Sequence, residues 1–474
     1  MKLLKACILF FLAAVLPLLP PRFCPAMPAV TKIDLPNQLK VLVFQEHSVP
    51  AVTLQFLIGA GSSFDPHGME GLANLTARSL SLGTRTLSFD QINDRLDFLG
   101  ATYGVECTRD FVLIGMQVLK KDLAPGVDLF TQMLEHPSFG DSDIELKKEE
   151  IVGRLREEED NPLEIAKRSF DRALFLKSPY AGAIEGGKKS VAAIAPGQVA
   201  IFYSQFYRPD NAVLVVGGDI TPGEVRTKII PKLLGWKAGP VAEPTFRTQS
   251  ARGAVKVDID RPISQAVVII GCSAMKRSSP DYYPFLVLSR ILGSGALSGR
   301  LSAEIRTRRG LAYAVQSRLA AYKHAGAFRV VLRTRNGSVE PATALVQKEL
   351  ARLREKPVSE AELKAAKDFM IGNFPLEYSL PENFAKFLAE SEFYGLGPEY
   401  LEKYPSLIES VTPGDIQRVA RKYLTPQNVV VVVGDLRKIN SGMNTAPPAP
   451  APQFPGPAHN ANAPAPGPPK PAGN

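Results

Sequence analysis

The sequence predicts an α+β protein with two homologous α/β sandwich domains, each a largely antiparallel sheet that helices cover on one face. Three observations lead to this fold class. One strand-like segment occurs in both halves of the chain, apolar extended runs open each half, and long helical patterns follow them. With 474 residues, 45% of them hydrophobic, the chain is long enough to bury two cores.

The repeat is clearest at the end of each half. Residues 206–219 read Phe-Tyr-Arg-Pro-Asp-Asn-Ala-Val-Leu-Val-Val-Gly-Gly-Asp, and residues 423–435 read Tyr-Leu-Thr-Pro-Gln-Asn-Val-Val-Val-Val-Val-Gly-Asp. Each copy predicts a helix end, a Pro-Asn turn and a buried strand that glycine terminates. A helix start precedes each copy, at Pro196 and at Pro413 with Thr412 as its N-cap. A repeat of this length indicates two similar domains.

Periodicity places further elements within each half. Strands are predicted at residues 51–58 and 266–270, where apolar residues run almost without interruption. Helical patterns are predicted at residues 91–99, 144–172 and 360–373. Strands with helices grouped between them are typical of helices packed on an antiparallel sheet.

The two ends and the middle of the chain have different compositions. Lys2 and Lys5 precede a short apolar run, which predicts a secretory signal peptide cleaved after Ala26, with an uncleaved anchor as the alternative. We therefore expect export across the inner membrane and a periplasmic location. The predicted organisation is a signal peptide (1–26), an N-terminal domain (27–240), a Gly/Pro-marked linker (241–252), a C-terminal domain (253–440) and a Pro/Ala-rich disordered tail (441–474).

Charge and cysteine content exclude several classes of protein. The net charge of +9 is modest for this length, and no basic stretch alternates with aromatic residues, so nucleic-acid binding is disfavoured. No stable membrane span is expected once the signal peptide is removed. Cys107 and Cys272 lie in apolar, strand-like segments and are interpreted as buried thiols rather than a disulfide framework.

Residues 71–78 carry the most specific motif. They read Gly-Leu-Ala-Asn-Leu-Thr-Ala-Arg, and a Gly-Thr pair follows at Gly83. The segment resembles the active-site helix of the insulinase/pitrilysin-type (inverzincin) zinc metallopeptidase family, Gly-Leu-Ala-His-x-x-Glu-His. There, two histidines four residues apart bind zinc from one helix face and the glutamate acts as general base. Here Asn74 and Arg78 take the histidine positions and Ala77 takes that of the glutamate.

The resemblance also locates the third ligand position of the family, a downstream glutamate. Counting back from Asp160-Asn161-Pro162 places it at Arg154, and a slipped register would place it at Glu150. A guanidinium has no lone pair to donate to a metal, and Ala77 cannot accept a proton. None of the five histidines, His47, His67, His136, His324 and His459, has a helical ligand partner. We expect no metal and no intrinsic catalytic residue in this chain.

The second half keeps another family feature. Residues 293–315 are similar to the family's glycine-rich turn, Ser-Arg-Leu helix and Arg-x-x-x-Gly-Leu-x-Tyr segment. The resemblance implies that Arg306 and Tyr313 bind substrate, the arginine holding the main chain and the tyrosine hydroxyl stabilising the oxyanion. Arg308 and Arg309 compete for the arginine role, and a role in packing alone is the alternative for the pair.

Together these features resemble a non-catalytic subunit of a two-chain bacterial member of the family. The resemblance implies a heterodimer in which a zinc-motif-bearing subunit supplies the metal and this chain contributes Arg306 and Tyr313. Such a chain would be inactive alone and belong to a metallo-endopeptidase complex that binds peptides as an added strand. The alternative is a structural or peptide-binding protein of the same fold without a proteolytic complex. An acquired role for Arg78 and Arg154, such as binding a peptide carboxylate, stays open.

Overall fold

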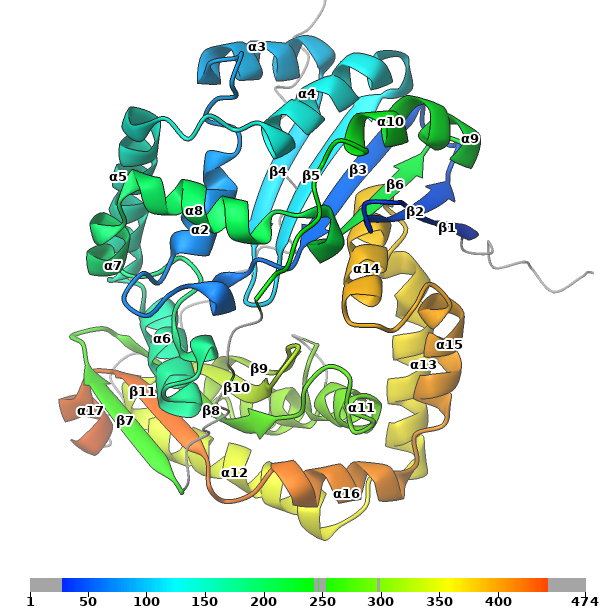
Figure 1. The fold of residues 1–474 in the computed structure, drawn as a ribbon. Coiled ribbons are helices and arrows are strands. Elements are labelled where there is room, and N and C mark those ends of the chain that lie inside the picture. The colour runs from blue at the N-terminus through cyan, green and yellow to red at the C-terminus, as the bar shows by residue number, and fades with distance from the viewer. Residues whose placement is uncertain (1–27, 243–245, 247–252, 296–298, 442–474) are drawn as a thin grey trace, which may run out of the picture.

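The computed structural model describes residues 28–242, 246, 253–295 and 299–441, and two β-sheets organise them (Figure 1). The predicted signal peptide, most of the predicted linker and nearly all of the predicted tail lie outside the described residues. The proposed domain limits therefore stay predictions. No helix among the described residues is long and apolar enough to cross a membrane.

The first sheet has six strands in the order β1-β2-β6-β3-β5-β4. Only the β2–β6 pair is parallel. Its strands are β1 (Val30–Asp34), β2 (Lys40–Gln45), β3 (Ala51–Ile58), β4 (Thr102–Cys107), β5 (Val112–Leu119) and β6 (Ala212–Gly218). Every residue of β6 is buried, as expected for a central strand with both faces covered.

The second sheet has five strands in the order β7-β11-β8-β10-β9, and only β7–β11 is parallel. They are β7 (Val255–Asp260), β8 (Gln265–Ala274), β9 (Ala312–Ala321), β10 (Gly326–Arg335) and β11 (Val429–Gly434). Apart from β1, the two sheets correspond strand for strand. The repeated segments form β6 and β11 in equivalent places, which confirms the predicted pair of similar, largely antiparallel sheets.

Helices account for most of the remaining described residues. The α-helices are α2 (Leu72–Ser79), α3 (Phe89–Leu99), α4 (Leu123–Glu135), α5 (Asp141–Glu158), α6 (Pro162–Phe175), α7 (Lys188–Ala193), α8 (Pro196–Phe206), α9 (Pro222–Glu224), α10 (Ile230–Leu233), α11 (Tyr282–Leu292), α12 (Val339–Glu355), α13 (Glu360–Glu377), α14 (Pro381–Phe393), α15 (Tyr400–Glu409), α16 (Pro413–Tyr423) and α17 (Leu436–Ser441). Shorter or wider helical turns are η2 (Ser62–Phe64), η3 (Lys120–Asp122), η4 (Pro179–Ala181), η5 (Pro209–Asn211), η6 (Val225–Ile229), η7 (Ser302–Arg308) and η8 (Asn336–Ser338).

One predicted helix is divided. The helical pattern over residues 144–172 forms α5, which ends at Glu158, and α6, which begins at Pro162. The Asn161 side chain accepts a hydrogen bond from the Leu163 backbone N–H and caps α6. Proline fits the first turn of a helix but cannot continue one, so the chain turns here.

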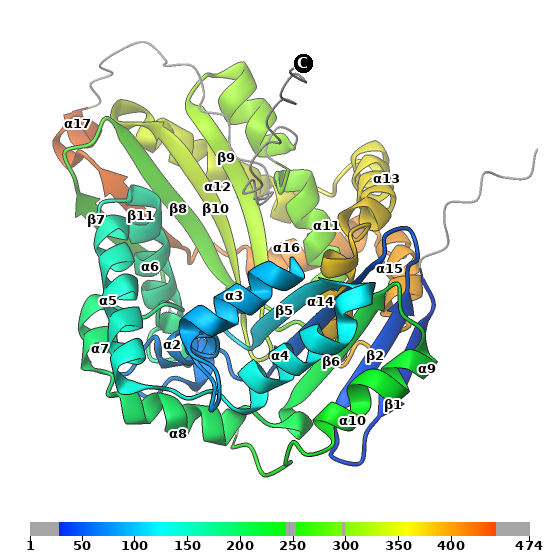
Figure 2. The ribbon, with the colours of Figure 1, turned by 90° about the horizontal axis from the view of Figure 1, so that it is seen from above.

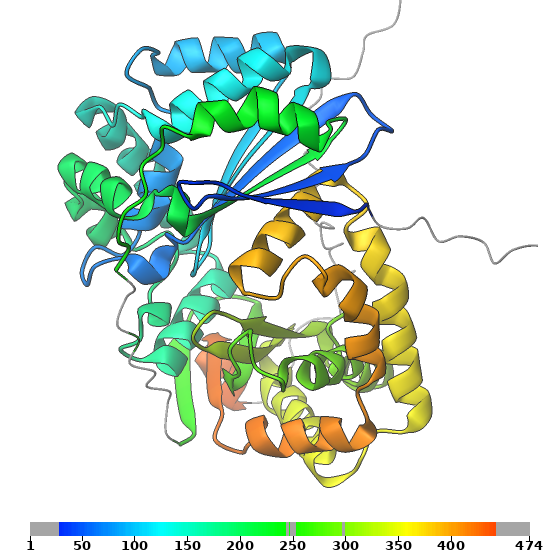
Figure 3. The ribbon, with the colours of Figure 1, turned by 45° about the vertical axis from the view of Figure 1, so that its right-hand side comes forward.

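The two halves exchange helices. α14, from the second half, packs on the first sheet against β3 and β6 (Figures 1 and 3). α6, from the first half, packs on the second sheet against β8 and β11 (Figures 1 and 2). Each sheet is therefore covered on one face by helices of its own half and on the other by a helix of the opposite half.

Successive side chains of a strand point to opposite faces of the sheet, and both faces are apolar here, which makes this exchange possible. In β2, Val41 and Val43 join the core beneath the first half's own helices, whereas Leu42 and Phe44 join the core that contains α14. The Phe44 ring meets that of Phe384 on α14 edge to face, with ring centroids 4.7 Å apart. The contact between the halves is thus a continuous apolar core rather than a loose domain interface.

Asp110 adds a polar contact between the halves. It lies between β4 and β5, and its carboxylate accepts hydrogen bonds from the hydroxyls of Tyr180 at 2.5 Å and Tyr394 at 3.0 Å. The same carboxylate accepts the Lys323 backbone N–H at 2.8 Å. Because Asp110 is 3% exposed, these bonds satisfy a carboxylate that would otherwise be costly to bury.

Candidate functional site

Helix α2 carries Asn74 and Arg78, two of the positions at which the sequence resemblance predicts metal ligands, and Asp65 fixes its first turn. The two carboxylate oxygens of Asp65 accept the backbone N–H groups of Gly71 at 2.8 Å and Ala73 at 2.7 Å. Burial raises the pKa of Asp65 to about 8, although these two bonds oppose the rise. The helix packs against α5, α8 and β4, so its residues are held on several sides.

A glycine-rich loop crosses the start of α2. Gly186 has φ +76°, and a Cβ atom there would lie 2.0 Å from the Glu70 carbonyl oxygen. Gly71 has φ +100°, and its Cβ would lie 2.7 Å from the Glu185 carbonyl oxygen. Both positions need glycine because of the left-handed backbone and the close approach of the two backbone segments. Ser190 holds the loop by donating its hydroxyl to the Glu70 carbonyl at 2.8 Å.

This loop places Glu185 between the arginines at two of the predicted metal-ligand positions. Arg154 Nη2 lies 3.0 Å and Arg78 Nη2 lies 3.9 Å from the same oxygen, Glu185 Oε1. Arg78 Nε also donates a hydrogen bond to Asn74 Oδ1 at 3.1 Å. Two of the three predicted ligand positions therefore share one carboxylate, and the third, Asn74, joins them through Arg78. Ala77 is fully buried in the apolar core and brings no ionisable group.

The geometry separates the two registers that the sequence left open on α5. Arg154 shares Glu185 with Arg78, as a third ligand position must if it faces α2. The Glu150 side chain is 60% exposed and pairs with Lys147 on its own helix. Of these two residues of α5, Arg154 is therefore the one that lies beside the predicted positions on α2.

The residues present do not fit a zinc ion. Two guanidiniums have no lone pair to offer, and their positive charges would repel a dication. An amide oxygen is a poor substitute for imidazole, and Asn74 Oδ1 is already occupied by Arg78. Across the part of the chain that the structure describes, no three His, Cys, Asp or Glu side chains group as metal ligands.

Glu185 is the site residue that sequence reasoning missed. No spacing rule connects it with α2 or α5, because its position depends on a loop that folds back over the helix. The glycines at 186 and 187 were the available signal, since adjacent glycines indicate close backbone approach.

Arg306 and Tyr313 lie in the second half, on η7 and at the start of β9 respectively. Both are half-buried, and neither side chain has a hydrogen bond or ion pair with any residue that the structure describes. The competing arginines are engaged: Arg308 and Arg309 both bind the carboxylate of Glu304, at 2.8 and 3.0 Å. Arg306 is therefore the arginine of η7 that is available to a ligand.

The structure keeps the two predicted sets of site residues apart. Asn74, Arg78 and Arg154 belong to the helical layer beside the first sheet, and Arg306 and Tyr313 belong to the second sheet and its flanking helix. Within the described ranges, no hydrogen bond or ion pair links the two sets. They do not form one site within this chain.

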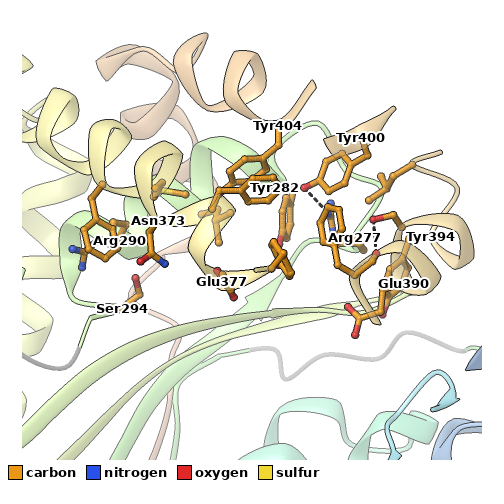
Figure 4. Close-up of a pocket in the computed structure, with 18 residues that line it drawn as sticks. Arg277, Tyr282, Arg290, Ser294, Asn373, Glu377, Glu390, Tyr394, Tyr400 and Tyr404 are labelled. Atoms are coloured by element: carbon orange, nitrogen blue, oxygen red, sulfur yellow. Dashed lines mark hydrogen bonds between the residues drawn. The ribbon is translucent and has the colours of Figure 1, made fainter. Parts of the chain in front are cut away.

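A separate cavity of about 310 Å³ lies between α11, α13, α14 and α15 (Figure 4). Aromatic side chains form a large part of its wall. The Arg277 guanidinium stacks 3.8 Å from the Tyr282 ring centre and donates a hydrogen bond to the Tyr400 hydroxyl at 2.9 Å. Neither Arg306 nor Tyr313 lines it. This cavity is part of the packing around α14 and does not contain the predicted site residues.

Known proteins resemble this chain over most of its length. The family model described as Insulinase (Peptidase family M16) matches residues 40–187, and the model described as Peptidase M16 inactive domain matches residues 193–370. An uncharacterized zinc protease of Streptomyces coelicolor is 25% identical over 86% of this chain and 90% of its own. A protein named non-peptidase homolog, from Helicobacter pylori, is 26% identical over 72% of this chain and 79% of its own.

Two solved structures share the fold. A crystal structure of a peptidase M16 inactive domain from Pseudomonas fluorescens superposes with a TM-score of 0.79 and 25% identity, covering 85% of this chain and 98% of that one. A protease from Helicobacter pylori superposes with a TM-score of 0.80, 18% identity and coverage of 86% and 100%, which shows the fold alone. The two-sheet arrangement is therefore common to these proteins.

Proposed function

Because this chain belongs to the insulinase family, peptidase family M16, we propose that it is the non-catalytic, substrate-binding subunit of a heteromeric zinc peptidase. The observation that carries the proposal is the contrast between its two sites. Arginines occupy two of the predicted metal-ligand positions, on α2 and α5, whereas the Arg306 and Tyr313 side chains have no hydrogen bond or ion pair with the described residues. A chain without a metal site needs a partner that supplies the metal if Arg306 and Tyr313 are to act in peptide hydrolysis.

In the proposed complex a second family member supplies zinc and its general base. Arg306 binds the substrate main chain, and the Tyr313 hydroxyl donates a hydrogen bond to the carbonyl oxygen that becomes negative in the transition state. Peptides bind as an added strand along a free sheet edge, for which β4 and β9 are candidates because each ends its sheet. We also propose, from the predicted signal peptide, that the complex works in the periplasm.

A second candidate function is peptide binding or a structural role without any proteolytic complex. The relative named non-peptidase homolog favours this candidate as much as the first, since both require loss of catalysis. The two differ in whether a zinc-bearing partner exists. Co-purification with a family member that carries an intact His-x-x-Glu-His motif, with peptide hydrolysis only in the mixture, supports the first candidate.

The decisive variant is Tyr313→Phe in the reconstituted pair. Removing one oxyanion donor should lower kcat by about 10²-fold, the low end for such donors, with the complex still assembled. Arg306→Met should raise KM or lower kcat, whereas Arg308→Met is the matched control because Arg308 is 72% exposed and already paired with Glu304. Unchanged turnover in Tyr313→Phe would show that the Tyr313 hydroxyl takes no part in catalysis and that the side chain only packs. Hydrolysis and stoichiometric zinc in the lone chain would overturn the proposal altogether.

A further inference from the structure

The former metal position contains more hydrogen-bond donors than acceptors. Asn74 is 2% exposed, and its amide Nδ2 is buried without a hydrogen-bond partner among the described residues. Two nitrogens of Arg154, Nε and Nη2, are also buried without a hydrogen-bond partner. Nη2 lies 3.0 Å from Glu185 Oε1, but this contact is an ion pair without hydrogen-bond geometry. Glu185 Oε2 is the corresponding unused acceptor. Buried donors are normally satisfied, so this excess indicates a missing acceptor.

The net charge of the site also favours an anion. Arg78 and Arg154 bring two guanidinium charges to the site, and both pair with the single carboxylate of Glu185. The contact from Arg78 is long, 3.9 Å, so Glu185 does not neutralise it fully. Glu158 does not supply the missing negative charge, because it forms an ion pair with Arg168. A second anion would therefore be attracted to this position.

The site is open on one side and closed on the other. Asn74 forms the buried floor, whereas the side chains of Arg78, Arg154 and Glu185 are about a third exposed, at 33%, 36% and 27%. An anion can reach the partly exposed guanidiniums from solvent, and Asn74 Nδ2 is the unpartnered buried donor beside Arg78. Planar guanidiniums favour carboxylates, which they can bind through paired hydrogen bonds.

The neighbouring strand indicates what could deliver such a carboxylate. β4 packs against α2, has no buried residue along its length and ends the first sheet, so its outer edge is free for another strand. Its last residue, Cys107, is half-buried. Desolvation of its thiol raises the pKa, and Arg78 lies close enough for the guanidinium charge to oppose this rise. A peptide paired with β4 would therefore reach the arginines at one of its ends.

We propose that Asn74, Arg78 and Arg154 form a binding site for a peptide carboxylate at the place where the family binds zinc. The inference rests on the proposed function only in taking a peptide as the ligand, and it does not require the partner subunit. Glu185 acts as the internal occupant with which the incoming carboxylate competes. The carboxylate comes either from the peptide's C-terminus or from an Asp or Glu side chain.

The test measures fluorescence anisotropy of labelled peptides with the full, signal-cleaved chain. The probes are an extended peptide of about ten Val, Thr, Ala and Tyr residues with a free C-terminus, the same peptide as its amide, and an amide with one internal Glu. The free acid should bind about tenfold more tightly than the plain amide, because charged hydrogen bonds are worth a factor of this size. Tight binding of the Glu-containing amide identifies a side chain as the source.

The variants separate this site from general attraction to a positive protein. Arg154→Met should abolish the preference for the free acid, and Arg156→Met, an exposed arginine of the same helix, should keep it. Glu185→Gln should strengthen binding of the free acid several-fold, because the internal competitor loses its charge. This variant acts in the opposite direction and so excludes misfolding as the cause. Circular dichroism and thermal melting check the fold of each variant.

Equal affinity for all three probes, or no binding of any of them, would overturn the inference. A preference that survives Arg154→Met would do the same. Either failure leaves the proposed function standing, because that function is judged by turnover in the reconstituted pair and by Tyr313→Phe. Conversely, a carboxylate preference in a chain that forms no peptidase complex would support the site and reject the subunit role.

Discussion

At the scale of single residues, the predicted metal-ligand positions have the opposite charge pattern to a zinc site. A zinc site gathers neutral or negative ligands around a cation, whereas here Arg78 and Arg154 gather around the carboxylate of Glu185. The carboxylate joins α2, α5 and the crossing loop as a metal would join them. Breaking such a pair leaves an uncompensated charge, so the reversal also maintains the packing of these segments.

If the three positions truly surround one point, restoring the motif should restore metal binding. The variant N74H/A77E/R78H/R154E is expected to retain about one zinc per chain after desalting, measured by mass spectrometry, whereas the wild type retains none at this position. The control is N74H/A77E/R78H with Arg154 unchanged, which lacks the third protein ligand. Equal zinc retention in this control would show that Arg154 is not the ligand position.

At the scale of elements, the site depends on two stretches of backbone that touch. The loop before α7 and the turn before α2 approach so closely that Gly186 and Gly71 each have a carbonyl oxygen where a Cβ would stand. Both glycines also have positive φ, which an L side chain disfavours. The position of Glu185 is therefore determined by the backbone and not by its own ion pairs alone.

Replacing one of these glycines should disturb the site and the fold together. Gly186→Ala is expected to lower the free energy of unfolding by about 2 kcal/mol or more, because strain at φ +76° adds to a clash with the Glu70 carbonyl. Gly153→Ala is the matched control: it lies within α5 with no atom near its Cβ position, so it should stabilise by roughly 0.5 to 1 kcal/mol. Denaturant unfolding measures both. A Gly186→Ala protein as stable as wild type would contradict the close approach.

At the scale of the whole molecule, the exchange of α6 and α14 couples the two halves. Phe170 of α6 packs with Ile269 and Val431 of the second sheet, and Phe384 of α14 packs with Phe44 and Leu57 of the first. Neither sheet can expose its second face without removing a helix that belongs to the other half. We therefore expect the two halves to unfold together, as one cooperative structure.

Glu390 on α14 should make the stability of this structure depend on pH. Burial, with a smaller effect of Glu106, raises its pKa from 4.5 to about 7, and Lys386 and Arg277 oppose the rise. The folded protein then holds a proton that the unfolded chain releases, so the free energy of unfolding falls as the pH rises from about 4.5 to 7. Glu390→Gln removes this loss of stability at high pH. The variant should be more stable than wild type at pH 8 by about 1 to 2 kcal/mol, after allowance for partial exposure of the side chain.

The measurement is thermal melting of both proteins between pH 5 and pH 8. Melting temperatures should lie closest at pH 5, where Glu390 is protonated in the folded state, and should separate by pH 8. Parallel curves across this range would show that Glu390 does not carry the pH dependence.

Several features of the fold and site could be predicted because local sequence encodes them. The valine-rich repeat, the Pro196 and Pro413 helix starts and the apolar run at residues 51–58 predicted elements that the structure contains. The prediction failed at residues 144–172, where a continuous helical period concealed the stop at Pro162. Periodicity reports which face is apolar and does not register a short break between two helices of similar pattern.

The sequence by itself determined the residue types at the positions where the family resemblance predicts the metal ligands and the base: asparagine, arginine and alanine. Residue identity alone excludes a metal-binding lone pair from arginine and a proton acceptor from alanine. Only the tertiary structure decided that Glu185 joins Arg78 to Arg154, that Arg306 is available while Arg308 is not, and that α6 and α14 change places. These facts depend on contacts between distant segments and on the direction of side chains. Local pattern cannot fix such contacts, since they form only when both sheets and their helices pack together.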